Sequence, residues 1–312
     1  MENVGNKLKK HFPNMIFDEP LGKYSTFQIG GPADFFYKLK NKNELPAIIR
    51  FCRTNNIHYF IFGSGSNILF DDRGFRGMVI KIETKEIKVI GTTIVADSGV
   101  PVSTLLNESL KHSLTGLERW IGLPGTVGGA VRGNAGCNGL ETKDVLLKAT
   151  IIDTETGRIK EAGSLYFNFS YRDCKLKKTG EIVLDATFKL QKSSKSPADQ
   201  KKIMQGLNRR RLQKQPFGLT TGSFFKNPSP DKPAGMLIDQ AGLKGKTIGK
   251  AQISAKHGNF FLNIGGASSK DIIGLAQLAR RKVKAKFGIE LEEEVQIVGK
   301  NKLIKLAKDN AP

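Results

Sequence analysis

The sequence predicts an α+β fold with more than one packed unit, and three observations support this prediction. The chain has 312 residues, of which 39% are hydrophobic, which is enough for two or three separate cores. Short strands and helices follow one another without a regular strand–helix–strand repeat, which argues against a doubly wound parallel sheet. A polar stretch at residues 191–199, QKSSKSPAD, is the best candidate for a boundary between units.

The first half of the chain alternates between the two apolar periodicities. Residues 44–55 have the spacing of an amphipathic helix, and residues 58–70 form an apolar strand that runs into a glycine–serine turn. Residues 78–99 alternate apolar and polar side chains, which is typical of a strand pair or meander. Residues 102–113 return to helical spacing, with a start near Pro101 or Ser103.

The remaining elements follow on both sides of the boundary. Residues 148–162 have the pattern of a hairpin that turns at TETG. After the boundary the pattern predicts a compact α/β unit that begins with a basic helix and the loop TTGSFFKNPSP. Its other elements are a helix at 234–242, a strand at 258–266, a long helix at 269–287 and a final strand at 289–299.

Composition limits the function classes. The net charge of +21 would suit a nucleic-acid-binding protein, but the basic residues are spread along the chain. Their one tight cluster is Arg209–Arg211 with Lys214, and no known nucleic-acid-binding motif accompanies it. Nucleic-acid binding therefore remains only as an alternative. Three cysteines and four scattered histidines give no disulfide framework and no metal spacing, so we expect no metal.

Nothing in the sequence directs the chain to a membrane or out of the cell. No apolar run approaches the length needed to cross a bilayer. The N-terminal stretch MENVGNKLKKHF lacks the apolar segment of a signal peptide. We therefore expect a cytoplasmic protein.

Two glycine-rich segments point to a bound cofactor. GSGSN at 63–67 follows an apolar strand, and its glycines allow neighbouring N–H groups to converge on a phosphate, although a plain turn would explain this segment alone. Residues 122–139 contain seven glycines and few side chains large enough for a core, so we expect a second loop there. So many glycines cost conformational entropy unless the backbone must approach something closely. Together the two loops predict a dinucleotide whose pyrophosphate lies between them.

Nine motifs, in order along the chain, resemble the UDP-N-acetylenolpyruvoylglucosamine reductase (MurB) family of bacterial peptidoglycan synthesis. The resemblance extends from about residue 22 to residue 299. The motifs are YSTFQIGGPADFF, GSGSNILF, GLERWIGLPGTVGGAVRGNAG, FSYRD, RLQKQP, GSFFKNP, AGMLIDQAGLKG, SAKHGNFFLN and LEEEVQIVG.

The resemblance implies a fold, a reaction and a set of domains. It implies an FAD-binding domain of the vanillyl-alcohol-oxidase (PCMH) type at 1–192, in subdomains of about 20–85 and 86–192. A substrate-binding domain at 200–300 and a tail at 301–312 would follow. The chain resembles the shorter subclass, which lacks a tyrosine-bearing insertion. In the implied reaction, NADPH reduces tightly but non-covalently bound FAD, which then reduces UDP-N-acetylglucosamine enolpyruvate to UDP-N-acetylmuramate. We expect a monomer that binds neither nucleic acid nor a membrane.

The resemblance also implies three catalytic residues. Arg172, in FSYRD, would bind the substrate carboxylate with its forked guanidinium, whereas the residues alone also allow a salt bridge with Asp173. Ser223 would give a proton to the α-carbon, although a loop serine is usually a turn former. Glu294 would be the catalytic glutamate, chosen by its place immediately before Val-x-Ile.

Periodicity alone does not select this glutamate. If residues 289–299 form one strand, the apolar residues share one face and the polar residues share the other. A solvated acidic face would explain the three consecutive glutamates equally well. The apolar face would hold Ile289, Leu291, Val295 and Ile297, and the polar face Glu292, Glu294 and Gln296.

Further site residues follow from the same resemblance. The FAD-binding residues would be Gly63, Ser64, Gly65, Ser66, Asn67, Pro124, Gly125, Thr126, Gly128, Gly129, Asn134 and Gly136. The substrate-binding residues would be Tyr171, Arg211, Lys226, Asn227, His257 and Asn259, with a structural hydrogen-bonding role open for the last two.

Two features depart from the family pattern or are left open by it. Cys137 and Asn138 stand where the family commonly has alanine and tyrosine, so an aromatic contact to the flavin from this segment is in doubt. Trp120 fits a contact to the cofactor and a place in the core equally well. Of Phe224 and Phe225, we expect at least one to pack inward and fix the direction of Ser223.

The residues leave two rivals to the reductase. One is a different flavoenzyme on the same cofactor fold, such as a sugar oxidase, and the other is a basic nucleic-acid-binding protein.

Overall fold

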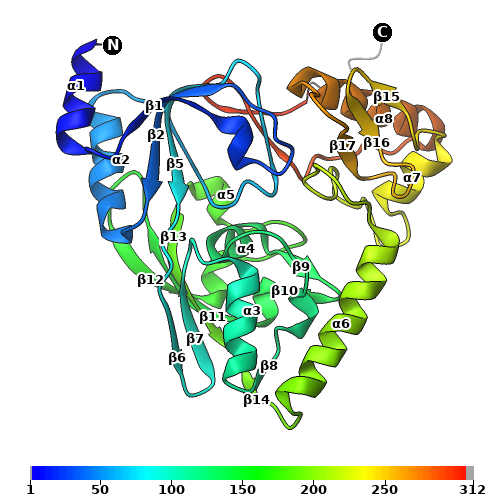
Figure 1. Ribbon diagram of the computed structural model, residues 1–312, viewed down its shortest axis with the longest axis horizontal. Coiled ribbons are helices and arrows are strands. Elements are labelled where there is room, and N and C mark those ends of the chain that lie inside the picture. The colour runs from blue at the N-terminus through cyan, green and yellow to red at the C-terminus, as the bar shows by residue number, and fades with distance from the viewer. Residues whose placement is uncertain (1, 307–312) are drawn as a thin grey trace. The chain divides into compact units, whose positions relative to one another are not determined.

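The computed structural model describes residues 2–306, with side chains from residue 4, and divides into two compact units (Figure 1). Unit 1 consists of Met1–Met15, Tyr37–Ser64 and Val79–Arg210, and unit 2 of Ile16–Phe36, Gly65–Met78 and Arg211–Pro312. The division crosses β2 (Pro32–Leu39), β5 (Phe75–Ile82) and α6 (Pro197–Lys214). In this division, residues 16–36 and 65–78 belong to the same unit as the C-terminal part of the chain. The domain boundaries proposed from the sequence do not include this grouping.

Unit 1 is built on a five-stranded antiparallel sheet with the order β12-β11-β13-β7-β6. The predicted hairpin at 148–162 is confirmed as the pair β11–β12, and the predicted meander includes the pair β6–β7. These strands are β6 (Ile87–Ile90), β7 (Thr93–Asp97), β11 (Leu146–Ile152), β12 (Ile159–Gly163) and β13 (Ile182–Lys189).

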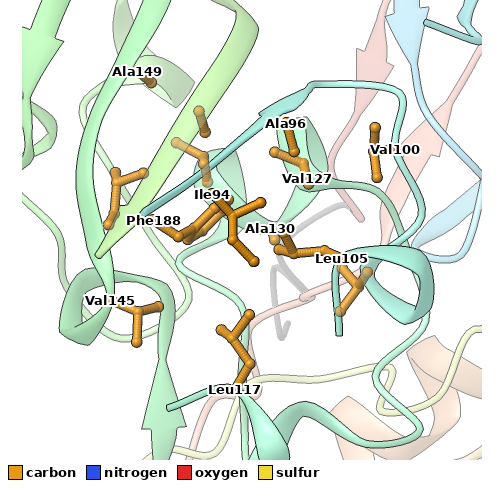
Figure 2. Close-up of a cluster of buried hydrophobic side chains, with 14 of the residues drawn as sticks. Ile94, Ala96, Val100, Leu105, Leu117, Val127, Ala130, Val145, Ala149 and Phe188 are labelled. Atoms are coloured by element: carbon orange, nitrogen blue, oxygen red, sulfur yellow. The ribbon is translucent and has the colours of Figure 1, made fainter. Parts of the chain in front are cut away.

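The core of unit 1 lies between this sheet and two helices. Figure 2 shows Ile94, Ala96 and Phe188 of the strands facing Leu105 of α3 (Val102–Lys111) and side chains of α4 (Val127–Gly133). Trp120 is 1% exposed and packs edge-on against Phe188, so the structure supports its core role. The other regular elements are α1 (Glu2–His11), α2 (Leu45–Thr54), β3 (Tyr59–Phe62), β8 (Leu114–Thr115), β9 (Gly136–Cys137), β10 (Leu140–Glu141), α5 (Leu176–Thr179) and β14 (Gln191–Lys192).

Unit 2 has two small sheets around a long helix. One sheet is antiparallel, with the order β15-β16-β17, and the other places β18 between β19 and the parallel strand β4. Its core joins side chains of α7, α8, β17 and the 224–225 segment. The elements are β1 (Ile16–Pro20), β4 (Ile68–Phe70), α7 (Ala234–Gln240), β15 (Thr247–Ile248), β16 (Ala251–Ile253), β17 (Phe261–Asn263), α8 (Ser269–Phe287), β18 (Gln296–Val298) and β19 (Leu303–Ile304).

The long helix α8 was predicted to the residue because its end signals are local. Ser268 and Asp271 form a reciprocal capping box at its start, and Gly288 ends it in the left-handed conformation with φ 69°. Ile272, Leu275 and Ala279 recur on one buried face, which packs α8 into the core of unit 2.

Two predictions about regular structure were wrong. The second glycine-rich segment is not a loop throughout, because it contains the short helix α4. Thr126 caps this helix, and its buried Val127, Ala130 and Val131 offset the poor helix propensity of glycine. The final strand is limited to Gln296–Val298 and does not begin at residue 289.

The predicted tail at 301–312 lies only partly within the described residues. Leu303–Ile304 pair with β18, while residues 307–312 lie outside the described part of the chain. Among residues 2–306, no helix is both long and apolar enough to cross a membrane.

Candidate functional site

Ser223 lies in the wall of a cavity of about 330 Å³ in unit 2. Asn227, His257 and Asn259 line the same cavity, so the structure brings together four of the residues expected from the sequence. These residues come from two segments more than 25 residues apart in the chain. Residues 223 and 260 form an antiparallel bridge, which explains the proximity of the two segments.

The backbone around Ser223 is held by Asn259, which is 1% exposed. Its Oδ1 accepts a hydrogen bond from the N–H of Phe225 at 2.9 Å, and its Nδ2 donates to the carbonyl of the same residue at 2.8 Å. The carbonyl of Asn259 accepts from the N–H of Phe224 at 2.8 Å. The side-chain amide of Asn259 therefore pairs with the backbone of Phe225 as a neighbouring β-strand would. These contacts support the structural hydrogen-bonding role that the sequence left open for Asn259.

Both phenylalanines after Ser223 are buried, which confirms that at least one packs inward. Phe224 is fully buried and Phe225 is 1% exposed. Phe224 stacks on Phe261 with ring centroids 4.7 Å apart, and Phe225 meets the same ring edge-on at 5.9 Å. Because two large rings anchor the chain directly after Ser223, its backbone direction is fixed by the core of unit 2.

His257 and Asn227 shape the cavity from opposite segments. The Nδ1 of His257 accepts from the N–H of Asn259 at 3.2 Å, and burial, with Lys244 nearby, lowers the pKa of the imidazole. We therefore expect a neutral ring with its proton on Nε2. The Oδ1 of Asn227 accepts from the N–H of Ala234 at 3.1 Å and holds the start of α7.

Two lysines at this cavity were not among the site residues expected from the sequence. Lys244 and Lys256 line it, together with Asp239 and Met236. Lys244 pairs with Asp239 at 2.5 Å, and Lys256 donates to the carbonyl of Leu212 at 2.7 Å. Both lysines lie inside motifs that carried the family resemblance, AGMLIDQAGLKG and SAKHGNFFLN, and that position was the available signal.

Glu294 lies beside the serine segment in unit 2. Its N–H donates to the carbonyl of Phe224 at 2.9 Å, and its own carbonyl accepts from Nδ2 of Asn67 at 3.0 Å. The two preceding glutamates have cationic partners: Glu292 pairs with Lys226 at 2.7 Å and Glu293 with Arg280 at 3.0 Å. Glu294 is therefore one backbone hydrogen bond from the residue that follows Ser223.

Arg172 belongs to unit 1. Its backbone has φ 55°, a left-handed conformation that costs a non-glycine residue on the order of 1–3 kcal/mol. Its Nη2 donates to the carbonyl of Gly136 at 2.9 Å, and its guanidinium lies 5.4 Å from the ring centre of Tyr171. Arg172 is thus fixed against the second glycine-rich segment. Arg211, in unit 2, donates from Nε to Gln215 at 2.8 Å.

The two glycine-rich segments meet inside unit 1. A Cβ on Gly63 would lie 2.3 Å from Oγ1 of Thr126, so only glycine allows this approach. A Cβ on Gly128 would lie 2.8 Å from Cβ of Ser98. The predicted proximity of the two segments is therefore present in the structure, at Gly63 and Thr126.

Other residues of these segments are used to hold the chain. Asn134 is fully buried, and its Nδ2 donates to Glu141 at 3.0 Å and to the carbonyl of Ser170 at 2.9 Å. The carbonyl of Gly125 accepts from the N–H of Val102 at 3.0 Å, while Pro124 and Ser64 are exposed. Asn138 donates to the carbonyl of Arg119 at 2.8 Å.

Glycines of the second segment with open space beside them indicate whether this surface suits FAD. A Cβ on Gly133 would meet nothing within 4 Å, and one on Gly129 would meet only Oγ1 of Thr126 at 3.7 Å. Glycine within a helix destabilises it by about 1 kcal/mol relative to alanine, and here the protein's own packing gives no reason for it. An open strip along one face of a short helix suits a flat ligand that approaches the backbone closely.

Polar groups in unit 2 agree with a ligand beside the first loop. The hydroxyl groups of Ser25 and Thr26 are buried and make no hydrogen bond to the described chain. The N–H of Thr26 donates to the carbonyl of Gly65 at 3.3 Å, and a Cβ on Gly65 would lie 2.0 Å from the carbonyl oxygen of Tyr24. The residues present therefore fit an FAD-binding surface. Within residues 2–306, no cluster of histidine, cysteine and carboxylate side chains could hold a metal ion.

Comparison with known proteins agrees with both halves of the chain. Residues 33–163 match the FAD binding domain family, and residues 214–298 match the C-terminal domain of UDP-N-acetylenolpyruvoylglucosamine reductase. The first half of the chain therefore carries an FAD-binding domain.

Relatives and a solved structure cover nearly the whole chain. UDP-N-acetylenolpyruvoylglucosamine reductase of Clostridium botulinum (strain Okra / Type B1) is 41% identical over 288 residues, which are 92% of this chain and 93% of that protein. The enzyme of the same name from Caldanaerobacter subterraneus is 40% identical over 91% of this chain and 94% of its own length. The crystal structure of UDP-N-acetylenolpyruvylglucosamine reductase (MurB) from Thermus caldophilus has a TM-score of 0.76 and 31% identity, and the match covers 91% of this chain and 98% of that one. On this evidence the chain belongs to the UDP-N-acetylenolpyruvoylglucosamine reductase (MurB) family of FAD-dependent oxidoreductases.

Proposed function

We propose that this protein reduces the enolpyruvyl group of UDP-N-acetylglucosamine enolpyruvate to give UDP-N-acetylmuramate, with NADPH as the source of hydride. The observation that carries the proposal is the cavity of unit 2. A serine hydroxyl, a histidine whose pKa is lowered by burial, and two lysines line one space of about 330 Å³. The lysines suit a substrate with two phosphates, and the serine suits a reaction that consumes one proton.

FAD is the cofactor of this proposal, held by the residues of the two glycine-rich segments. When bound, FAD would supply the chemistry of hydride transfer from NADPH to the β-carbon of the enolpyruvyl double bond. The close approach of Gly63 to Thr126 and the open strip at Gly129 and Gly133 support this binding surface. Within unit 2, the buried hydroxyl groups of Ser25 and Thr26 make no hydrogen bond to residues 2–306, which supports a ligand beside Gly65.

Ser223 is the proposed proton donor to the α-carbon. Addition of hydride to the β-carbon leaves negative charge spread over the α-carbon and the carboxylate, which makes the α-carbon strongly basic. A serine hydroxyl is a weak acid, so it suits only a basic partner of this kind. The buried Phe224 and Phe225, together with Asn259, hold the backbone that carries this hydroxyl.

Arg172 and Glu294 are the other proposed catalytic residues. Arg172 would bind the substrate carboxylate, where a fixed cation stabilises developing negative charge much better than water does. Its left-handed backbone, fixed beside Gly136, is the kind of strain found at functional positions and supports this role. Glu294 is proposed to act beside Ser223, because its N–H donates to the carbonyl of Phe224.

The other predicted substrate residues fall into two groups. We propose that Tyr171, Arg211, Asn227 and His257 contact the substrate. Lys226 and Asn259 have strong partners on the chain, Glu292 and the backbone of Phe225, and these contacts support a role in positioning for both residues.

Three further statements belong to the same proposal. We propose that the protein acts as a cytoplasmic monomer and binds no nucleic acid. Sedimentation of the flavin-loaded protein would test whether it is a monomer. Salt-dependent retention of duplex or single-stranded DNA would contradict the proposal that it binds no nucleic acid. We also propose an FAD-binding domain at 1–192 and a substrate-binding domain at 200–300, which limited proteolysis near residues 192–200 would test.

The visible spectrum of the purified protein tests the function directly. The protein should be yellow, and anaerobic NADPH should bleach the flavin absorbance. The enolpyruvyl nucleotide should then restore the colour, whereas UDP-N-acetylglucosamine, which lacks the double bond, should not. A protein that cannot be loaded with FAD would refute the proposal, and peroxide formation from a simple sugar would favour the oxidase instead.

A further inference from the structure

Three consecutive glutamates, Glu292–Glu294, stand beside the serine segment, and only one of them serves the proposed reaction. In an extended segment a slip of one residue turns every side chain to the opposite face. Such a slip would bring Glu293 to the place of Glu294. The buried side chains of Leu291 and Val295 resist such a slip, and the ionic partners of the first two glutamates are further contacts that can fix the register.

The structure holds the first two glutamates with cations from two different segments. Glu292 pairs with Lys226 across the bridge between the two segments, with the N–O distance at 2.7 Å, but its side chain is 70% exposed. Glu293 pairs with Arg280 of α8 at 3.0 Å, and these side chains are 14% and 10% exposed. The second pair is therefore screened much less by solvent than the first.

The backbone next to this pair is joined directly to the segment of Ser223. Residues 225 and 293 form an antiparallel bridge, and the N–H of Lys226 donates to the carbonyl of Glu292 at 2.8 Å. The N–H of Glu294 donates to the carbonyl of Phe224 at 2.9 Å. A shift at Glu293 would thus move both Glu294 and the residues after Ser223.

Arg280 can hold this register because α8 is packed into the core of unit 2. Its Nη1 also donates to the carbonyl of Leu306 at 3.3 Å, and Ala276, Ala279 and Val283 around it are buried in the core of unit 2. Burial raises the pKa of Glu293, while the charge of Arg280 opposes this shift. Without Arg280, the buried carboxylate of Glu293 would lose its cationic partner. We would then expect this side chain to turn toward solvent.

We propose that the Arg280–Glu293 ion pair is a positioning device that sets the register of the three glutamates and so presents Glu294 beside Ser223. The inference rests on the proposed function, because it assigns Glu294 to the reduction of the substrate. Neither residue of the pair is proposed to contact the substrate.

The experiment compares the two half-reactions of the flavin-loaded protein in R280M, E293Q and the double variant. Bleaching by NADPH should stay within about twofold of the unchanged protein. Reoxidation by the enolpyruvyl nucleotide should slow by about 10–100-fold in R280M, because a misplacement of about 1 Å can cost 10²-fold in rate. The double variant should be no slower than R280M, since both changes remove the same pair. R280K should recover part of the rate.

Lys284→Met is the matched control. It removes an ion pair between α8 and the same following segment, Lys284 with Glu290 at 2.9 Å, but both side chains are nearly half exposed. Its reoxidation rate should not change. Hydrogen exchange of the peptide covering residues 289–299 should be faster in R280M than in K284M, which gives a readout independent of activity.

The outcomes separate failure of this inference from failure of the function. If the unchanged protein is bleached by NADPH but not reoxidised by the nucleotide, the proposed function is wrong. If the unchanged protein turns over and R280M matches K284M in reoxidation and in hydrogen exchange, the positioning role is overturned. Equal slowing of both half-reactions would also overturn it. Should R280M fail to retain FAD, E293Q serves for the same comparison.

Discussion

Replacement of Asn259 by alanine should both destabilise unit 2 and slow the reaction. The change removes two hydrogen bonds to Phe225, at 2.9 and 2.8 Å, in a place where Asn259 is only 1% exposed. The N–H and carbonyl of Phe225 would lose these partners, and each buried group left unsatisfied costs about 1–3 kcal/mol. The expected loss of unfolding free energy is therefore about 2–6 kcal/mol in total.

Thermal unfolding of the flavin-loaded protein measures this loss. For a protein of this size a loss of about 2–6 kcal/mol lowers the melting temperature by roughly 5–20 °C. The reoxidation of bleached flavin by the enolpyruvyl nucleotide should also slow by about 10–100-fold, because Ser223 lies two residues before the released backbone. Asn107→Ala is the control, since Asn107 is exposed on α3 and should melt as the unchanged protein does.

One result would refute this reasoning. If Asn259→Ala melts within about 1 °C of Asn107→Ala, the two hydrogen bonds contribute nothing net, and the packing of the two phenylalanine rings alone holds the serine segment. Slower reoxidation with an unchanged melting temperature would instead assign Asn259 to the substrate and not to the backbone.

Three further changes test other parts of the molecule. Ser223→Ala should leave bleaching by NADPH intact but slow reoxidation by about 10²–10⁴-fold, as loss of a proton donor does, and equal damage to both steps would exclude that role. Gly63→Ala should lower the amount of FAD retained after gel filtration, because its Cβ would clash at 2.3 Å, whereas Gly206→Ala in α6, with nothing within 4 Å, should retain it. Hydrogen bonding from Arg73 lowers the pKa of Asp71, so this carboxylate should stabilise the fold above about pH 4, and the stability should be lost as pH falls through its folded pKa. Asp71→Asn should therefore flatten the acid limb of stability against pH, and an unchanged limb would contradict the assignment.

The parts of the fold that could be predicted from the sequence are those with local signals. The long helix α8 has its capping box and its terminal glycine within the sequence it encloses, and its bounds were predicted correctly. The helix α4 was missed because three of its seven residues are glycines, which argue for a loop when read one residue at a time. Burial of Val127, Ala130 and Val131 in the core of unit 1 outweighs this local preference.

The candidate site was accessible only through the order of motifs. Nothing in the spacing of residues 223 and 257 implies that they line one cavity, because the bridge between residues 223 and 260 is non-local. The choice among the three glutamates had the same limit. It depends on Lys226 and Arg280, which lie far from them in the chain or on the preceding helix. Periodicity carries no information about such pairs.

Three asparagines expected to touch ligands show how the chain holds its proposed catalytic residues. Asn67 donates to the carbonyl of Glu294, Asn134 to the carbonyl of Ser170 two residues before Arg172, and Asn259 clamps Phe225 two residues after Ser223. An asparagine amide suits this task, because it can both donate to and accept from irregular backbone without adding a charge to bury. The contacts of these three asparagines support roles in holding the backbone, whereas the order of the motifs had predicted contacts to ligands. We therefore expect the serine, the arginine and the glutamate to contact the substrate, while neutral amides hold the backbone next to them.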